Sequence, residues 1–246
     1  MRAFVSGLLL AAVACTCDAA GAPQATRILF IGNSLSATTD IPGRLEKLAR
    51  DMGKAAAVES LIEPAFELED HWKDARALAT IAKGWDVVVL QQGPSASADD
   101  RAKLVEYSRR FAVPIRKAGA WPALFMTWPV QDRLAEFPAV IASYRAAAAA
   151  ADAILLPAGE AWLRLLSKLP RERLHSGSGH ASALGSDLAV LTIYLSLFPA
   201  GAHEFDEAYM DRIARSLGME ASRRDDYFDA ATRAIDEPLP LAQSVP

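Results

Sequence analysis

The sequence predicts an α/β fold, a three-layer α/β/α sandwich around a five-stranded parallel sheet. From residue 27 onward, short apolar segments of strand length alternate with segments that have the periodicity of helices. The apolar segments are hydrophobic on both faces, as expected for strands that helices cover on both sides. The chain has 246 residues, 52% of them hydrophobic, and no internal repeat, which favours one domain. We place this domain at residues 27–236.

Five strands are expected, and the first has the strongest signature of burial. Its residues Leu29, Phe30 and Ile31 leave no polar face, which is typical of a central parallel strand. The third strand contains three consecutive valines, whose branched side chains favour extended backbone. In chain order, the strands are expected at Ile28–Ile31, Ala56–Ile62, Asp86–Gln91, Ala123–Trp128 and Ala153–Leu156.

Helices are expected between these strands. The first is capped by Asp40 and ends at Gly53, which is a frequent residue at helix ends. A late helix has leucines at helical spacing, and we expect it to be buried. Polar helices follow it, and residues 237–246 are predicted to form a loose tail. In chain order, the main helices are expected at residues 41–52, around 72–81, at 99–118, from 134 into an alanine tract, and at 184–198.

Residues 1–19 have the composition of a signal peptide. A positively charged start precedes the apolar stretch Phe4–Ala14, which is too short to span a bilayer. Cleavage after Ala19 would remove both cysteines and release an exported protein without disulfides. We therefore expect a bacterial periplasmic or secreted protein. In the alternative, Cys15 becomes the lipidated first residue of a membrane-anchored protein.

Charge and motifs exclude several classes of partner. The formal net charge is −4 with both signs interspersed, which does not fit a nucleic-acid-binding surface. The sequence contains no cluster of Cys and His with metal-ligand spacing and no glycine-rich phosphate-binding loop. We expect no metal, no organic cofactor and no membrane-spanning segment, and the sequence leaves the oligomeric state open.

Ser34 and His180 are the candidates for chemistry. Ser34 follows Gly32-Asn33 at the end of the first strand, and ligands in open α/β sheets bind at the carboxyl ends of strands. Its hydroxyl is a candidate nucleophile, although serine after a strand also serves as a turn or cap residue. His180 follows a loop of small residues and can act as the base if that loop crosses the same sheet edge. The alternative is a histidine exposed on a surface loop.

Six segments of the chain form an ordered set between about residue 27 and residue 200. They are Phe30–Ser34, Leu68–Trp72, Trp85–Gln91, Thr127-Trp128, Pro157–Trp162 and His180–Ser186. In this order they resemble the SGNH hydrolases, the GDSL-like esterase superfamily, and most closely its Gly-Asn-Ser branch of exported bacterial proteins. The resemblance implies the flavodoxin-like α/β/α fold of that superfamily and an esterase activity.

The resemblance also implies roles for individual residues. Ser34 would be the nucleophile, and His180 the general base that then serves as the acid for the leaving alcohol. The oxyanion hole of the family uses the nucleophile's own amide, a glycine amide and an asparagine side chain. In this sequence Ala65 stands for the glycine, and Gln92 or Ser95 would replace the asparagine.

The sequence departs from the family at the group that orients the histidine. The family has an aspartate three positions before the histidine, where this chain has Gly177. Replacing that carboxylate by an amide lowers kcat by about 10⁴ in a serine protease triad, so we expect a handicapped Ser–His dyad. Glu160, just after the fifth strand, is a hypothetical substitute. The alternative is a glutamate favoured by a helix N-terminus.

Three residues are expected to line the pocket: Asn33, His71 and Trp128. Asn33 precedes the candidate nucleophile. His71 follows the second family segment, although it can equally have a structural role. Trp128 comes after the fourth strand, where an indole can stack on a sugar or pack into the core.

These observations favour an exported serine esterase that hydrolyses a small acyl ester, such as an acetyl group on a carbohydrate. The alternative is a catalytically degenerate SGNH domain that binds a glycan or an envelope partner without turnover, as Gly177 and the altered third segment suggest. A more distant alternative is a flavodoxin-like binding protein, against which the missing phosphate loop argues.

Overall fold

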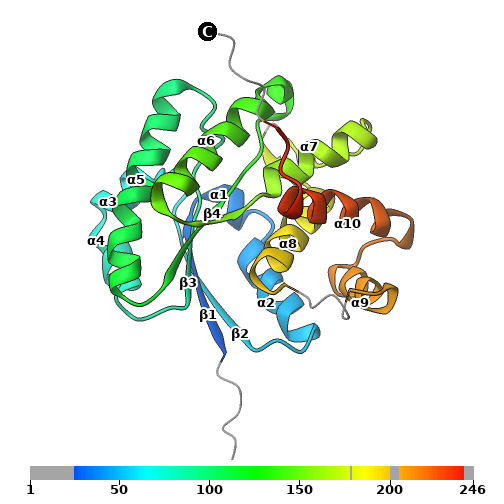
Figure 1. Ribbon diagram of the computed structural model, residues 1–246, viewed down its shortest axis with the longest axis horizontal. Helices are drawn as coiled ribbons and strands as arrows, with labels where there is room; N and C mark the ends of the chain where they lie inside the picture. The colour runs from blue at the N-terminus through cyan, green and yellow to red at the C-terminus, as the bar shows by residue number, and fades with distance from the viewer. Residues whose placement is uncertain (1–24, 178, 200–204, 241–246) are drawn as a thin grey trace, which may run out of the picture.

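A five-stranded parallel sheet forms the centre of the protein, whose computed structural model describes residues 25–177, 179–199 and 205–240 (Figure 1). Its spatial order is β2-β1-β3-β4-β5, and all four neighbouring pairs are parallel. This confirms the predicted sheet. The predicted signal peptide lies outside the described residues. The strands are β1 (Thr26–Gly32), β2 (Ala56–Ile62), β3 (Val87–Leu90), β4 (Trp121–Phe125) and β5 (Ile154–Leu156).

Helices cover both faces of the sheet and complete the predicted three layers (Figure 1). One face packs against α3 (Leu68–Lys73), α4 (Ala75–Ile81), α5 (Ala98–Lys117) and α6 (Phe137–Ala151). The opposite face packs against α2 (Ile41–Asp51), α7 (Ala158–Lys168), α8 (Ala183–Leu197), α9 (Glu207–Leu217) and α10 (Ala221–Asp236).

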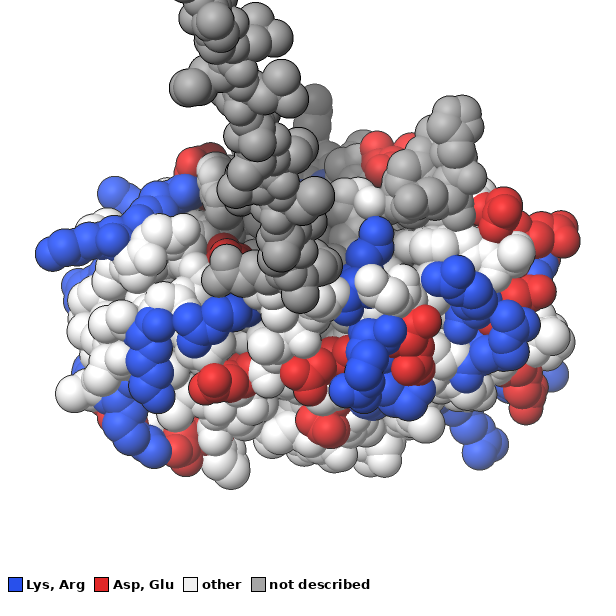
Figure 2. Space-filling model, turned by 90° about the horizontal axis from the view of Figure 1, so that it is seen from below, with Lys and Arg blue, Asp and Glu red and all other residues white. Residues whose placement is uncertain are grey.

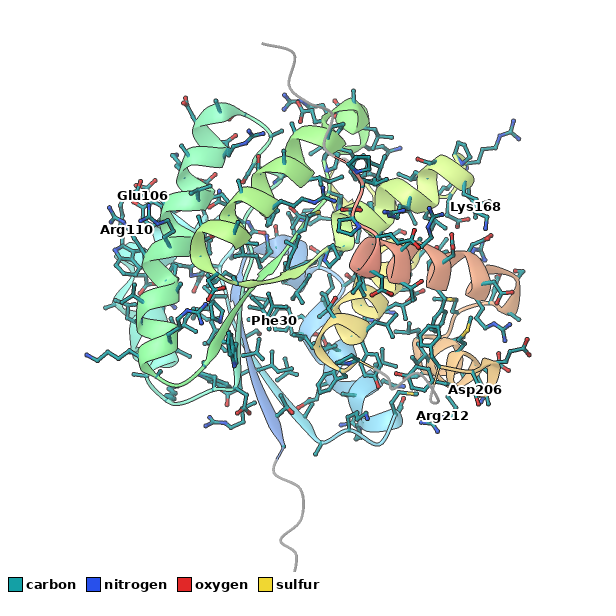
Figure 3. All side chains as sticks on the ribbon, in the orientation of Figure 1. Phe30, Glu106, Arg110, Lys168, Asp206 and Arg212 are labelled. Atoms are coloured by element: carbon teal, nitrogen blue, oxygen red, sulfur yellow. The ribbon has the colours of Figure 1, made fainter. Side chains whose placement is uncertain are left out.

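The first strand shows why the sheet needs two covering layers. Side chains alternate along a strand, so Leu29 and Ile31 enter the core on the α5 side, while Ile28 and Phe30 enter the core on the α8 side. All four are fully buried. Figure 3 shows Phe30 in the middle of the molecule, between the sheet and the helices of the second layer. The continuous apolar run predicted this two-sided burial.

The order of the strands creates a topological switch point between β1 and β3. After β1 the chain passes to β2 on one side, and it then returns to β3 on the other side of β1. Such a reversal separates the connections that leave the carboxyl ends of β1 and β3, and ligands of open α/β sheets bind there. The residues that follow these two strands, Asn33-Ser34 and Gln91-Gln92, therefore share one edge of the sheet.

Several elements differ from the expectations. The helix expected around residues 72–81 is two helices, because Asp74 has extended backbone and its carboxylate accepts from the amide of Arg76 to cap α4. The fourth strand ends at Phe125, three residues earlier than predicted. Helix α8 is buried on all sides from Gly185 to Leu195, since α2, α7 and α10 surround it.

The C-terminal region packs more closely than predicted. Helices α9 and α10 contribute buried aromatic residues, among them Tyr227 and Phe228, to the core. The segment after α10 was expected to be loose, but Arg164 donates to the carbonyl of Glu237, and Arg145 donates to that of Leu239. These bonds hold residues 237–240 against α6 and α7; the rest of the predicted tail, 241–246, lies outside the described residues.

The surface has a mixed charge pattern. On the face that Figure 2 shows, basic and acidic side chains are interspersed, and neither sign forms a continuous area. In the described part of the chain, no helix combines the length and the apolar character that crossing a membrane requires.

Candidate active site

Ser34 lies directly beyond the carboxyl end of β1, where it begins the short helix α1 (Ser34–Ala37). The preceding Asn33 has extended backbone, and its side chain caps α1 by accepting from the amide of Leu35 at 3.1 Å. The amide of Ser34 belongs to the first helical residue, so it has no acceptor inside the helix. This turn leaves the Ser34 side chain partly exposed at the sheet edge.

His180 reaches this hydroxyl from a part of the chain 146 residues away. It lies on a two-stranded hairpin, β6 (His175–Ser176) and β7 (His180–Ala181), which the sequence did not predict. Nε2 of the imidazole lies 3.0 Å from Oγ of Ser34, and both side chains are partly exposed. The distance allows the hydroxyl proton to pass to the imidazole as oxygen attacks a bound electrophile.

Buried groups hold the hairpin in place. The indole Nε1 of Trp128 donates to the carbonyl of Gly179, the residue before His180, at 3.0 Å. Nε2 of His175 donates to the carbonyl of Pro129 at 2.9 Å, and burial lowers the pKa of this imidazole. The amide of Ser182 donates to the carbonyl of Leu174 at 2.8 Å. These bonds fix both ends of the hairpin to the β4–α6 connection and to helix α8.

Comparisons with solved structures identify the fold. The chain is similar to a protein from Slackia heliotrinireducens that its description places among the SGNH hydrolases, with 24% identity, a TM-score of 0.59, and coverage of 71% of this chain and 100% of that one. The chain has the SGNH hydrolase fold. No model of a protein family and no curated protein matches the sequence.

Two further solved structures share this SGNH hydrolase fold. A DUF4886 family protein from Bacteroides uniformis has 15% identity and a TM-score of 0.68, and the match covers 90% of this chain and 98% of that one. A mutant of Axe2, an acetyl-xylooligosaccharide esterase from Geobacillus, has 13% identity and a TM-score of 0.50, with coverage of 80% and 95%. At these sequence identities, the structural similarity establishes the fold alone.

The candidate oxyanion donors of this SGNH fold differ in accessibility. Ala65 is exposed and has a φ of +62°, a left-handed conformation that favours glycine and costs an alanine about 1 kcal/mol. The carbonyl of the next residue, Phe66, accepts from Nδ2 of Asn33 at 2.9 Å, so this loop lies against the nucleophile turn. The amide of Ser34 thus has no acceptor within α1, and the loop that carries Ala65 lies against the nucleophile turn.

Gln92 and Ser95 are placed differently from what we expected. The Gln92 side chain is fully buried; its Nε2 donates to Oγ of Ser95 at 3.0 Å, and its Oε1 accepts from the amide of Leu68 at 3.2 Å. Oγ of Ser95 donates in turn to the carbonyl of Gly93 at 3.1 Å. Because Gln92 and Ser95 form hydrogen bonds with buried neighbours, they support the loop that follows β3. Neither presents a free donor to a substrate.

Glu160 does not reach the histidine. Its fully buried carboxylate lies between two arginines, 2.5 Å from Nη2 of Arg145 and 3.2 Å from Nη2 of Arg164. It also accepts from the amide of Leu239 at 2.7 Å. The proposed orienting role is therefore not supported, since these partners occupy both oxygens. Across the described ranges, no carboxylate forms an ion pair or a hydrogen bond with His180.

The expected lining residues lie beneath the site instead. Trp128 and His71 are 1% and 0% exposed, so neither forms the wall of an open pocket, and Asn33 is 8% exposed. Nε2 of His71 donates to the carbonyl of Gly32 at 2.8 Å, and burial lowers the pKa of the imidazole. Its Nδ1 has no partner within the described part of the structure. We correct these three residues from lining to supporting roles.

One side chain at the centre of the site was missed. Gln91 lies in the third segment of the resemblance, but nothing in the sequence assigned it a function. Its buried amide bonds to Asn33, which precedes Ser34 on the turn, and to Ser36, which lies two residues after it. The sequence signal for Gln91 was a glutamine at the carboxyl end of a buried strand, next to the strand that leads into the Gly-Asn-Ser turn. A buried polar side chain at that position needs hydrogen-bond partners.

No group of three His, Cys, Asp or Glu side chains in the described ranges could hold a metal ion.

Proposed function

We propose that the protein is an exported serine esterase that cleaves a small acyl ester by acyl transfer through Ser34. The observation that carries this proposal is the 3.0 Å approach of Nε2 of His180 to Oγ of Ser34 at the switch point of the sheet. A hydroxyl that shares a proton with an imidazole at this position is the minimal arrangement for nucleophilic catalysis.

The reaction proceeds in two halves. Oγ of Ser34 attacks the ester carbonyl while its proton passes to Nε2 of His180, and the oxyanion would accept hydrogen bonds from the amides of Ser34 and Ala65. The imidazolium then gives this proton to the departing alcohol, which leaves an acyl group on Ser34. Water attacks that acyl group with His180 again as the base, and the carboxylic acid leaves as the hydroxyl of Ser34 is restored.

The proposed substrate is an acetyl ester of a carbohydrate. The description of Axe2 as an acetyl-xylooligosaccharide esterase supports this class. The signal-like residues 1–19 support export, which would bring the enzyme to envelope or external carbohydrates. The partial exposure of both dyad residues suits a bulky alcohol that remains outside the protein while the small acyl group reaches Ser34.

A binding protein without turnover is the second candidate. It is favoured by Gly177 at the position of the family's aspartate and by the absence of a carboxylate partner for His180 in the described ranges. Such a domain would keep the sheet and its switch point but would bind a glycan without cleaving it.

Hydrolysis of p-nitrophenyl acetate by the purified protein decides between the two. We expect a rate that depends on Ser34, so that Ser34→Ala and His180→Ala each abolish it, and the double variant is no slower than either single variant because the pair acts as a unit. We also expect a fluorophosphonate probe to label Ser34. A wild-type rate equal to that of Ser34→Ala, without labelling, would contradict the esterase and support the binding protein.

A further inference from the structure

The amide of Gln91 occupies the space between the ends of β1 and β3. Its backbone continues the strand pairing, since its amide donates to the carbonyl of Ile31 at 2.9 Å. Its side chain is fully buried and crosses toward the turn that carries Ser34. A buried amide is costly to the fold unless its donors and its acceptor are hydrogen-bonded. The Gln91 side chain therefore needs hydrogen-bond partners in the folded protein.

Four hydrogen bonds use the full capacity of the Gln91 amide. Oε1 accepts from the backbone amide of Asn33 and from Oγ of Ser36, both at 2.9 Å. Nε2 donates to Oδ1 of Asn33 at 3.0 Å and to the carbonyl of Gln92 at 2.8 Å. The orientation of the amide is determined by this set, because turning it over would bring oxygen against oxygen and hydrogen against hydrogen.

These bonds fix the nucleophile turn on both sides of Ser34. Asn33 precedes the serine and is held by its backbone and by its side chain, and Ser36 follows two residues later. The same Oδ1 of Asn33 caps α1 through the amide of Leu35. Gln91 touches neither Ser34 nor His180 in these contacts, so its effect on Ser34 would pass through the turn.

Gly32 shows independently how closely the turn fits this amide. A Cβ added to Gly32 would lie 2.4 Å from Oε1 of Gln91, which is closer than any real contact. The φ of Gly32 is not in the left-handed region, so backbone freedom does not explain this glycine. The space that Oε1 of Gln91 requires does explain it.

We propose that Gln91 is the positioning residue of the nucleophile, and that its amide must both accept and donate for Ser34 to meet His180. Glutamate at this position has the same shape but would place an acceptor against Oδ1 of Asn33 and the carbonyl of Gln92. Methionine has a similar volume but neither function. A placement error of about 1 Å can reduce turnover by about 100-fold, so these variants should lose turnover per folded molecule.

The kinetic test rests on the proposed acyl transfer. For Gln91→Met we expect kcat on p-nitrophenyl acetate to fall by about 100-fold, with KM changed by less than about twofold. Gln91→Glu should lose as much, because its carboxylate cannot donate to Oδ1 of Asn33 or to the carbonyl of Gln92. Gly32→Ala, which displaces the same amide without changing its chemistry, should resemble Gln91→Met.

Thr192→Val is the matched control. Thr192 is also fully buried, and its hydroxyl donates to the carbonyl of Leu188 within α8, away from the turn. We expect this variant to lose stability while it keeps kcat. If Gln91→Met keeps kcat within about threefold of wild type, or if Thr192→Val loses kcat equally, the inference is overturned.

A structural measurement separates this inference from the proposed function. Crystal structures and amide hydrogen exchange of wild type and Gln91→Met need no turnover. We expect the mutant to show faster exchange at Asn33 and Leu35 and a lost hydrogen bond between Ser34 and His180. If wild type proves inactive but these changes occur, the esterase proposal fails and the positioning role stands. An unchanged Ser34–His180 distance in Gln91→Met would refute the positioning role.

Discussion

The indole rings of Trp128 and Trp162 stack face to face, with their centroids 3.9 Å apart and their planes 2° apart. Each indole also donates to a backbone carbonyl, Trp128 to Gly179 within the histidine hairpin and Trp162 to Gly185 in the first turn of α8. The stacked pair thus forms a rigid base under His180. The carbonyls, rather than a substrate, occupy the polar atoms of the two rings.

The first prediction concerns this base. Trp128→Phe keeps an aromatic ring but removes the donor to Gly179, so we expect about 1 kcal/mol less stability and a kcat lower by about 10- to 100-fold. Trp85→Phe is the control: it also loses an indole bond to a carbonyl, that of Thr80 at 2.8 Å, but it lies before β3 at the other end of the sheet. Equal losses of kcat in both variants would argue against a specific role for Trp128.

The second prediction concerns Glu160 as a structural residue. Glu160→Gln leaves Arg145 and Arg164 without their buried carboxylate, and breaking such a buried pair costs about 3–5 kcal/mol. We expect this loss in urea unfolding, with the turnover of the folded fraction unchanged. Glu106→Gln, which removes an exposed partner of Arg110 on the outer side of α5 (Figure 3), should cost less than about 1 kcal/mol. A stable Glu160→Gln variant with reduced turnover would restore the orienting role.

The third prediction concerns pH. Burial lowers the pKa of His71 in the folded protein below its ordinary value of about 6.5, so the unfolded chain takes up the proton first as pH falls. The contribution of neutral, buried His71 to the stability of the fold is therefore complete above the pKa of this histidine in the unfolded chain. It is lost as pH falls toward the lower pKa of His71 in the folded protein. We expect the free energy of unfolding to fall between about pH 7.5 and 5.5, by at most about 1.4 kcal/mol per pH unit for each proton.

His71→Gln should make this pH dependence weaker, because glutamine keeps a donor for the carbonyl of Gly32 but does not titrate. Part of the slope should remain, since burial also lowers the pKa of His175. Urea unfolding of both proteins across this pH range measures the difference. Identical slopes would show that His71 does not contribute.

The fourth prediction concerns the missing carboxylate. Gly177 has a φ of +67°, and a Cβ there would have no heavy atom within 4 Å, so a side chain fits at a strain of about 1–2 kcal/mol. It follows Ser176, which pairs with His180 across the hairpin. We expect Gly177→Asp to raise kcat by at least about tenfold by orienting the imidazole, and the isosteric Gly177→Asn to have no such effect. Equal rates in the two variants would refute an orienting carboxylate at this position.

The layers of the fold were predictable because they depend on local pattern. A strand buried on both faces, such as Ile28–Ile31, is apolar at every position, and this is visible within four residues. Asp40 was expected as a cap, and its side chain accepts from the amide of Gly43. Where local signals competed, prediction was weaker: Asp74 interrupts a helical pattern because its carboxylate caps the following helix.

The candidate site was predictable as residue types but not as an arrangement. A glycine, an asparagine and a serine after a buried strand indicated a nucleophile turn, and the scarcity of histidines limited the choice of base. Glu160 looked available because its sequence position is near the sheet edge, yet Arg145 and Arg164 reach it from α6 and α7. Arg164 lies four residues after Glu160 on the same helix, but sequence position does not show that Arg145 from α6 will pair with this buried carboxylate.

The sequence by itself determined the parallel sheet, its two covering layers and the turn at Ser34, since hydrophobic periodicity and glycine chemistry act over a few residues. Only the tertiary structure decided that His180 meets Ser34 at 3.0 Å and that Gln91 satisfies its amide on Asn33. These contacts join segments that lie 146 and 58 residues apart. Hydrogen bonds between such distant segments depend on how whole layers pack, which no local pattern specifies.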